Sequence, residues 1–468
     1  MRQKYYIICL WVIFLCGLVL AHPKMVKAAA VSWDGGASSA NWSDANNWSN
    51  DAVPTPNDDV TINTAVTINI GSSTTIQSLS IGTSSPSTAT ILNFSYDAIT
   101  NGALTISGGN MTVWSGATIT HSAGNSVVVG TININVTSGN LNIYGSVNID
   151  GKGYTGGDPR TNGNGPGGGT GANDTDWSHY GGGGGHGGKG SSSLRNSSVV
   201  ASGGISNDSL TSPISLGSGG GGSGYNYSWE RGWGASGGGA VKLQVSGTTT
   251  IVGSITANGN SLPVQADNSG GGGGAGGSIN IITESLVGSG LVTANGGNGG
   301  YYNNYGQIFQ GGGGGGGRIS FFYGSTYSFS GTLTASLGGN GSGGEAGTIN
   351  IQTPITGTLI SSPFDTGSAD TLINKLSWTQ DLPDGTSIKF QLRTAPDNNG
   401  IAGSWSDWLG PTGTDSFYTD NTGSGVINTN HSDGANDQWI QYKIILKASM
   451  GNLTTPVVRD VSLEYVRV

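Results

Sequence analysis

Runs of consecutive glycines recur at one position of an internal repeat, and they restrict the folds open to this chain more than any other feature. The runs include 181–185, 270–274 and 311–317, and a strand-like segment follows the glycine-rich stretch in each of four copies. Aligning these segments on Val241, Ile279, Ile319 and Ile349 gives intervals of 38, 40 and 30 residues. A spacing of this size is typical of structural units that stack on one another.

A second strand-like segment follows the first in three of these copies. It occupies 253–259, 290–296 and 331–335, and the earlier segment 145–151 is similar to it. Each unit therefore holds two strands, an Asn-Gly type of turn, a variable loop and a glycine run. One unit cannot bury an apolar face alone, so the units have to stack. We predict a glycine-rich, right-handed parallel β-helix (a solenoid) over 141–354.

The glycine runs admit two interpretations. Flexible linkers are the simpler one, since glycine-rich segments often behave as random coils. However, ordering a glycine costs more backbone entropy than ordering any other residue, and a linker has no need of uniform runs at one fixed position. Glycine is required where backbones approach too closely for a Cβ atom, as in the polyproline II chains of collagen. We expect the runs to adopt polyproline II conformation and to hydrogen-bond side by side in a small bundle.

Residues 31–140 are predicted to form an N-terminal cap and the first coils of the solenoid. Apolar and polar residues alternate with period two, the mark of half-buried strands, at 60–62, 66–70, 76–81, 111–113 and 132–136. Trp33, Trp42 and Trp48 precede these strands. A solenoid needs a cover over its first coil, and we expect the three tryptophans to supply it. A sugar-stacking site is the alternative.

The segment 355–468 differs in composition from the repeats. Glycine becomes rarer, and turns such as Pro383-Asp384-Gly385 separate strand-like segments at 376–378, 387–393, 439–446 and 461–465. About 110 residues of this kind predict a C-terminal β-sandwich module. The whole chain is therefore expected to be all-β.

Two groups of residues resemble bacterial protein families. A resemblance to large secreted β-helix surface proteins rests on the glycine repeat and on the opening pattern Trp33-Asp34-Gly35-Gly36, Asn41-Trp42, Asn47-Trp48 and Asp58-Asp59-Val60. The segment 364–461, which includes Trp405-Ser406-Asp407-Trp408, resembles β-sandwich modules of extracellular bacterial proteins, some of them discoidin-like or carbohydrate-binding. The resemblance implies an adhesin-like surface protein, and no catalytic motif of a family can be carried over.

The first 30 residues are predicted to be a signal peptide. Arg2 and Lys4 precede an apolar run at 5–21, and the alanines at 28–30 supply small residues for cleavage before Val31. An uncleaved membrane anchor is the alternative, because about 17 apolar residues lie at the lower limit for spanning a bilayer. We expect an exported protein located outside the cell or at its surface.

The charge balance excludes some classes of partner, and the cysteine content excludes disulfides from the folded chain. The chain has 18 basic and 27 acidic residues, and cleavage would leave 14 basic ones and a net charge of −13. Such a balance argues against nucleic acid and anionic membranes as partners. Cys9 and Cys16 both lie in the leader, so the remaining chain has to be stable without disulfides.

Aromatic residues on loops are the predicted binding surface. Glycine segments offer no side chains for recognition, whereas Tyr and Trp give large contact areas at low entropic cost. The candidates are Tyr225, Tyr227, Trp229, Trp233, Tyr301, Tyr302, Tyr305, Trp405, Trp408 and Tyr418. A polysaccharide or a cell-surface glycan is the predicted partner. The alternative is that these rings only cover backbone or fill a core.

No arrangement of titratable residues predicts catalysis. Glutamate is scarce, and the histidines are scattered. Acidic groupings occur at Asp150, at Asp158 with Arg160 and at Asp174 with Asp176, where turn residues are the simpler interpretation. We therefore predict a non-catalytic surface or adhesion protein. A polysaccharide lyase or hydrolase built on a β-helix is the alternative.

Two weaker signals concern ice and metals. Thr256, Thr293 and Thr334 recur at the repeat spacing, which would suit an ice-binding face, although no paired ladder of threonines is sustained. Asp58 and Asp59 carry oxygen ligands of the type that Ca²⁺ prefers. Their spacing matches no recognised calcium loop, so no metal or cofactor is predicted.

Overall fold

The structure is a computed structural model of the 468-residue chain. It describes residues 28–84, 89–95, 103–123, 130–172, 180–224, 232–263, 270–304, 306–435, 437–449 and 454–468. Nearly all of the predicted leader lies outside these ranges. Strands dominate the described residues, whose helical segments are two short 3-10 turns, η1 (Ala45–Asn47) and η2 (Thr429–His431). The predicted all-β class is confirmed.

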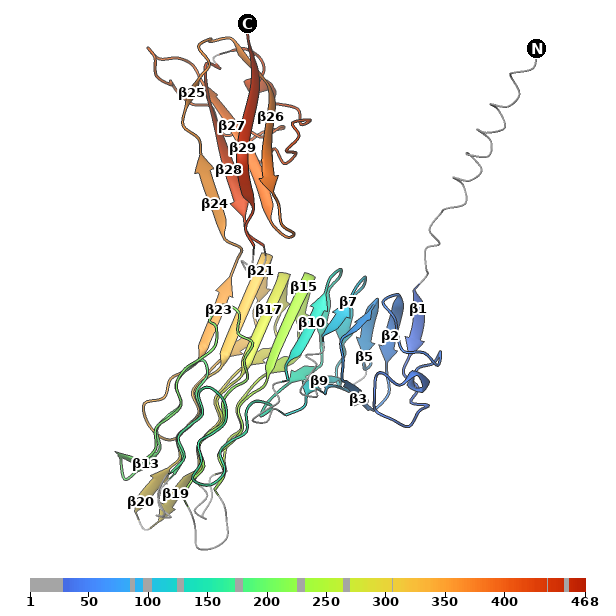
Figure 1. Ribbon diagram of the computed structural model, residues 1–468, viewed down its shortest axis with the longest axis vertical. Helices are drawn as coiled ribbons and strands as arrows, with labels where there is room; N and C mark the ends of the chain where they lie inside the picture. Colours follow the sequence, from blue (N-terminus) through green and yellow to red (C-terminus); the bar gives the residue numbers. More distant parts are fainter. Residues whose placement is uncertain are drawn as a thin grey trace, which may run out of the picture.

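Two parallel sheets contain most of the strands (Figure 1). The twelve-stranded sheet contains β1 (Ala29–Ser32), β2 (Asp58–Ile62), β4 (Thr74–Ile76), β5 (Ser78–Ile81), β7 (Leu104–Ile106), β8 (Met111–Val113), β10 (Ile132–Val136), β11 (Leu141–Ile143), β15 (Ala240–Ile251), β17 (Ser278–Gly288), β21 (Arg318–Phe329) and β23 (Thr348–Gln352). The seven-stranded sheet contains β3 (Thr67–Ile70), β6 (Ile91–Phe94), β9 (Thr118–His121), β12 (Ser146–Asn148), β16 (Ser254–Thr256), β18 (Leu291–Thr293) and β22 (Thr332–Thr334).

Most strands of these sheets pair with a strand one repeat further along the chain. β3 pairs with β6, β4 with β7 and β5 with β8, always in parallel, so every third strand stacks in one column. Two of the three columns then merge, because the long strand β15 pairs with β10 through its first half and with β11 through its second half. From β15 onward a long strand alternates with a short one, in the pairs β15 and β16, β17 and β18, and β21 and β22, and the last repeat adds β23 alone.

The pairing register confirms the alignment of the repeats. Val241 of β15 faces Ile279 of β17, which faces Ile319 of β21, which faces Ile349 of β23. The second strands pair in the same way, with Ile255 of β16 opposite Val292 of β18. The earlier segment also belongs to this column, since β12 pairs with β16. The intervals of 38, 40 and 30 residues are therefore the lengths of successive repeats.

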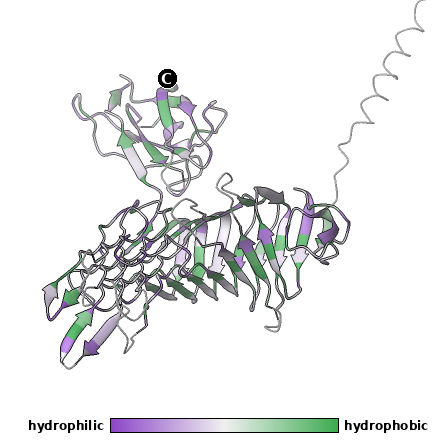
Figure 2. Cartoon of the chain, turned by 60° about the horizontal axis from the view of Figure 1, so that its bottom comes forward, coloured by the Kyte–Doolittle hydropathy of each residue, from purple (hydrophilic) through white to green (hydrophobic). Residues whose placement is uncertain are grey.

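A single apolar core lies between the two parallel sheets. Alternation with period two directs every second side chain inward, so that Ile132, Ile134 and Val136 of β10 are fully buried. Figure 2 shows green, hydrophobic bands along these strands. The strands predicted at 60–62, 66–70, 76–81, 111–113 and 132–136 are present, whereas β6, β7 and β9 were not predicted.

The three N-terminal tryptophans belong to this core. Trp33, Trp42 and Trp48 are 4%, 3% and 0% exposed. The Trp48 ring lies 5.1 Å from that of Trp33 and 4.7 Å from that of Trp42, and its Nε1 donates to the Trp42 carbonyl at 2.8 Å. Rings buried in this way have no face free for a sugar, so they act as packing residues beside β1 and β2.

The last residue of β9 is a buried histidine, His121. The His121 side chain is fully buried, its Nδ1 lies 2.7 Å from the Ser122 carbonyl, and its Nε2 accepts from the Ala240 N–H at 3.3 Å. The neutral ring thus satisfies both neighbours. Burial lowers the pKa of His121 to about 4.

Because the pKa of His121 is lowered, we expect the folded protein to lose stability in acid. The unfolded chain protonates it near pH 6.5, whereas the folded chain resists protonation down to about pH 4. The stabilisation is therefore complete above pH 6.5 and disappears as the pH falls toward 4, by an amount on the order of 3 kcal/mol. Urea unfolding at pH 7 and pH 4.5 should show a smaller pH effect in His121→Gln. Equal pH effects in both proteins would contradict the prediction.

The glycine segments lie side by side and hydrogen-bond to one another, as predicted. The N–H groups of Gly181, Gly182 and Gly183 donate to three different segments, at the carbonyls of Gly270, Thr170 and Ser191, and the N–H of Gly184 returns to the first segment at Gly273. Gly312 and Gly315 donate with the same spacing, to Gly181 and Gly184. A repeat of three residues is the period of polyproline II. Figure 1 shows these segments as long excursions from the ends of the strands.

Glycine is needed in this bundle for space rather than for an unusual backbone angle. A Cβ atom on Gly183 would stand 2.0 Å from the Gly313 carbonyl oxygen, and one on Gly272 would stand 1.9 Å from that of Gly182. Neither glycine has a positive φ. Because the obstructing atoms are backbone, no side-chain rotation can make room.

The C-terminal part consists of antiparallel sheets with a core of its own. One sheet contains β24 (Thr356–Ile360), β25 (Phe364–Asp365), β27 (Ser387–Ala395) and β28 (Trp439–Lys447), and the other contains β26 (Thr371–Asp381) and β29 (Val457–Arg467). Their shared core includes Ile373, Trp378, Phe390 and Ile440. The four strand segments predicted here lie in β26, β27, β28 and β29. The Lys447 ammonium donates to the Gly324 carbonyl of β21 at 3.3 Å.

Candidate functional site

The outward face of β27 and β28 gathers basic side chains. In the antiparallel register Arg393 faces Gln441, Gln391 faces Lys443, and Ser387 faces Lys447. The alternate residues Ile388, Phe390 and Leu392 point into the core. Period-two alternation therefore brings Lys389, Arg393, Lys443 and Lys447 to one face of the sheet, which we call the cationic face.

Two tryptophans from the loop after β27 stack on this face. The Arg393 guanidinium lies 4.6 Å from the Trp405 ring centre and 4.4 Å from that of Trp408, and the Lys443 ammonium lies 5.0 Å from the Trp408 ring. Lys389 approaches the Phe417 ring at 4.9 Å in the same way. Contacts of this type hold a cation in place without neutralising its charge.

Arg393 is positioned by hydrogen bonds as well as by stacking. Its Nε and Nη2 donate to Gln441 Oε1 at 2.9 and 2.6 Å, and the Gln441 amide is oriented in turn by donation to the Ser361 carbonyl at 2.7 Å. An arginine has five N–H donors, and the other three of Arg393 have no partner among the described residues.

The electrostatics of the cationic face favour an anion. β24, β27 and β28 contain no acidic residue, and Asp365 of β25, which accepts from Gln438 Nε2 at 3.0 Å, is the acidic residue of this sheet. Within the described ranges none of the four cations forms an ion pair. Asp407, exposed on the covering loop, lies between the two tryptophans in sequence. Burial, followed by the charge of Arg393, lowers the pKa of Lys443, and burial lowers the pKa of Arg393. A bound anion would favour the charged forms of both side chains and so oppose these shifts. This basic face belongs to a chain whose net charge is −9.

Of the predicted binding residues, the structure brings Trp405 and Trp408 together on this face. The prediction for Tyr418 is wrong: the ring is 4% exposed, lies in the core, and its hydroxyl accepts from the Asn428 N–H at 3.0 Å. The Trp408 ring contacts the charged groups of Arg393 and Lys443, so it holds these two cations in place.

The other predicted aromatic residues lie in the glycine-rich part. Trp233 is 54% exposed. Tyr301 and Tyr302 are half-buried on β19 (Tyr301–Asn304), which forms a hairpin with β20 (Gln307–Gln310), and Tyr302 stacks on Phe309 at 6.1 Å. Phe309 stacks in turn on the buried Tyr180 at 5.7 Å. These rings therefore cover one end of the bundle. Tyr225, Tyr227, Trp229 and Tyr305 lie outside the described residues.

A Ser, His and Asp cluster is buried where the bundle meets β17. Ser278 Oγ lies 2.9 Å from His186 Nε2 and donates toward Asp208 Oδ2 at 3.0 Å or the Ser215 carbonyl at 2.7 Å. In a hydrolytic triad the carboxylate holds the ring nitrogen remote from the serine; here Asp208 approaches the same nitrogen, at 3.7 Å. Ser278 and His186 are 0% exposed. The cluster thus connects three segments and offers no nucleophile to a substrate.

The pKa values of His186 and Asp208 are set by burial and by contacts within the protein. Burial, opposed by the nearby Asp208, lowers the pKa of His186 to about 4. Burial tends to raise the pKa of Asp208, but backbone hydrogen bonds from Ser215 and Ser209, the nearby His186 and the Ser278 hydroxyl together outweigh it, so the pKa is lowered overall. The Arg318 Nε donates to the Asn207 carbonyl at 2.9 Å, which adds a cation to the same region.

The acidic groupings that could serve catalysis and the threonines that could bind ice have structural positions that do not favour either function. The Asp150 carboxylate accepts from the Asn258 N–H at 2.6 Å in a turn, and the Asp158 carbonyl accepts from the Thr161 N–H at 2.8 Å, as expected for turn residues. Thr256, Thr293 and Thr334 are in register, but Thr293 is only 6% exposed, so the three make no exposed ladder. Asp174 and Asp176 lie outside the described residues.

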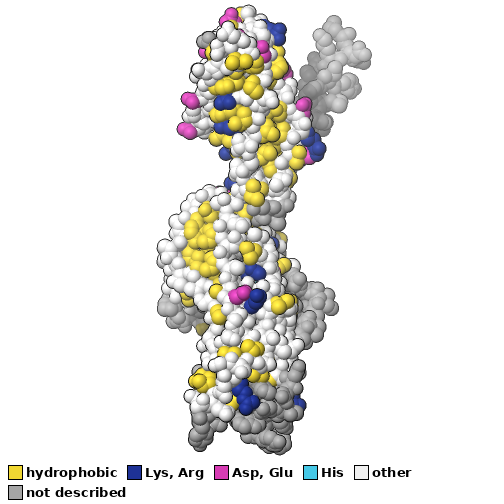
Figure 3. Space-filling view, turned by 90° about the vertical axis from the view of Figure 1, so that its left-hand side faces the viewer, with side chains coloured by type: hydrophobic (Ala, Val, Ile, Leu, Met, Phe, Trp, Pro, Cys, Tyr) yellow, Lys and Arg dark blue, Asp and Glu magenta, His cyan; other side chains and the backbone are white. Residues whose placement is uncertain are grey.

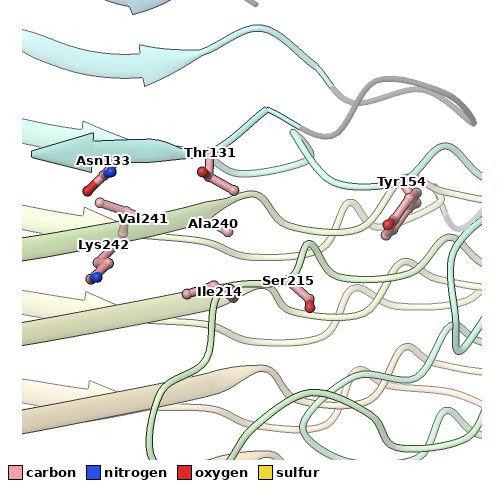
Figure 4. A pocket seen from close by; sticks show the side chains of 8 residues that line it. All are labelled: Thr131, Asn133, Tyr154, Ile214, Ser215, Ala240, Val241 and Lys242. Atoms are coloured by element: carbon pink, nitrogen blue, oxygen red, sulfur yellow. The ribbon is translucent and has the colours of Figure 1, made fainter. Parts of the chain in front are cut away.

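A groove of about 430 Å³ opens between β10, β15 and the loop at 214–215. Figure 4 shows Asn133 and Lys242 at one end of it and Tyr154 at the other. Among the described residues that line it, Lys242 is the charged one, and none of the described binding candidates belongs to the lining. It holds fewer groups for recognition than the cationic face does.

No family model, curated protein or solved structure matches this chain. In the described part of the chain no three His, Cys, Asp or Glu residues are grouped closely enough to hold a metal ion. The same residues include no helix of the length and apolarity that a membrane crossing needs. The cationic face is therefore the candidate site that the geometry itself supports best.

Proposed function

We propose that this is a non-catalytic extracellular or cell-surface protein that binds acidic glycans through the cationic face of its C-terminal module. Arg393 carries the proposal, because it stacks on Trp405 and Trp408 and is held by Gln441, while three of its N–H donors have no partner among the described residues. A guanidinium held in this way suits the carboxylate of a uronic acid or a sulfate ester. The outer edge of Trp405 would pack against the sugar ring.

The remainder of the chain serves in this proposal as a rigid stem. The columns of parallel strands support a right-handed β-helix, the three-residue hydrogen-bond period supports polyproline II segments, and the two antiparallel sheets around one core support a C-terminal β-sandwich. Export is supported by the leader-like residues 1–30. β1 starts at the exposed Ala29, and cleavage before Val31 would keep the buried part of that strand.

Binding to a polyuronate and to a neutral glucan tests the proposal. The polyuronate should bind, with an affinity that falls as salt is added, and the glucan should not. Arg393→Gln should lower the affinity for polyuronate about 10- to 100-fold, since hydrogen bonds to charged groups contribute about 1.5–3 kcal/mol.

Lys375→Gln is the matched control. Lys375 lies on β26 of the other sheet, where it pairs with Glu464 at 3.5 Å, so this variant removes one charge from the module without touching the cationic face. Its affinity should equal that of the unaltered protein. Equal binding of glucan, equal losses in both variants, or turnover of the polysaccharide would each refute the proposed function.

A further inference from the structure

The two ends of the parallel sheets differ in how their core is closed. At the N-terminal end Trp33, Trp42 and Trp48 cover the core. At the other end, Ile349 and Ile351 of β23 are 43% and 42% exposed, although the residues paired with them in β21, Ile319 and Phe321, are fully buried. The last repeat thus leaves its inward side chains uncovered. We call the layer formed by residues 323–355 the open end.

The open end also exposes strand edges. β23 pairs only with β21, and β22 pairs only with β18, among the strands that the structure describes. β21 continues past β23 from Tyr323 to Phe329 with β17 on one side only. Edges of this kind present unpaired N–H and C=O groups that favour pairing with another strand. In Figure 3, which looks at the side of the molecule where β23 lies, a hydrophobic patch is uncovered below the C-terminal sheets.

Charge does not oppose the approach of a second copy at this surface. Two copies of a chain with a net charge of −9 repel each other over most of their surfaces. Within 323–355, however, Glu345 is the one charged residue, and its carboxylate lies 3.3 Å from the Lys189 ammonium. The charges at the open end therefore do not prevent it from contacting the open end of a second copy.

We infer that two copies of this chain associate through their open ends about a two-fold axis. Such an axis sets β23 of one copy antiparallel to β23 of the other, which pairs both edges and buries Ile349 and Ile351 from both sides. The tryptophan-covered end offers no equivalent core, so copies cannot add head to tail. The assembly stops at two, with one cationic face on each copy.

The mass of the purified full chain in solution, measured by light scattering over a dilution series, tests this inference. The protein should be a dimer at micromolar concentration. Ile351→Glu and Ile349→Glu should give monomers, because each substitution places a negative charge from both copies close to the two-fold axis. Ile205→Glu, which alters an apolar residue that is 65% exposed in the loop beside the bundle, should remain dimeric.

A cross-link separates loss of the interface from loss of folding. In a chain with Cys9 and Cys16 changed to serine, Asn350→Cys at the centre of β23 should form a covalent dimer under mild oxidation, and Ser206→Cys in the loop at 205–215 should not. A monomer of unaltered protein at all concentrations, an open-ended polymer, or a dimer that survives both glutamate substitutions would overturn the inference. None of these results depends on glycan binding.

Discussion

Gly183→Ala should cost the protein at least about 3 kcal/mol of its free energy of unfolding, for the addition of one methyl group. The added Cβ would stand 2.0 Å from the Gly313 carbonyl oxygen and 2.4 Å from its carbon. Overpacking usually costs less, because neighbouring side chains can move aside. Here the neighbours are backbone atoms that belong to other hydrogen-bonded segments, so the bundle has to separate. Urea unfolding followed by circular dichroism measures the loss.

Gly357→Ala supplies the matched control for this substitution. Gly357 lies in β24, has no positive φ, and nothing within 4 Å would meet its Cβ. The same chemical change there should leave stability unchanged or raise it by up to about 1 kcal/mol. If the two variants unfolded alike, the glycine segments could not be packed backbone to backbone as described.

Trp48→Ala should cost about 3–5 kcal/mol, the range for deleting a large buried aromatic side chain. Trp48 is 0% exposed, contacts both Trp33 and Trp42, and donates the hydrogen bond to the Trp42 carbonyl. Its removal opens the covered end of the core and leaves that carbonyl without its donor. Hydrogen exchange should show the largest loss of protection in β1 and β2, with smaller effects farther along the sheets.

Trp233→Ala is the control for this second substitution. The Trp233 ring is 54% exposed, and changes at exposed sites usually remain within about 0.5 kcal/mol. A Trp48→Ala protein that unfolds at the same urea concentration as Trp233→Ala would show that the N-terminal tryptophans do not stabilise the sheets.

Much of the fold could be predicted because the sequence contains an internal repeat. Val241, Ile279, Ile319 and Ile349 align by their sequence context, and parallel pairing places them opposite one another. The strands β6 and β9 were harder to predict, since β6 begins with two adjacent apolar residues, Ile91 and Leu92, and β9 has Ile119 as its one aliphatic residue, so neither shows a clear alternation. The partners of each glycine run could not be predicted, because glycine carries no side-chain pattern from which to assign neighbours.

The candidate site was predicted only in part. Trp405 and Trp408 could be predicted from their aromatic character, whereas Arg393 and Lys443 were not predicted. The signal was present in the alternation of 387–393 and 439–446, which sets Lys389, Arg393 and Lys443 on the side opposite the apolar residues. Tyr418 was misassigned because a short aromatic pair, Phe417 and Tyr418, does not reveal which ring faces inward. Ser278, His186 and Asp208 lie far apart in sequence, so no linear motif could join them.

The glycine bundle has a consequence for how stability changes with temperature. Exposing apolar surface on unfolding raises the heat capacity, whereas exposing polar surface lowers it. The parallel sheets bury aliphatic side chains, but the contacts within the bundle join backbone amides such as those of Gly184 and Gly273. Unfolding the bundle therefore adds little heat capacity, and its stability does not fade on cooling as hydrophobic stabilisation does. This part of the molecule should have a flat stability curve and should hold its structure in the cold.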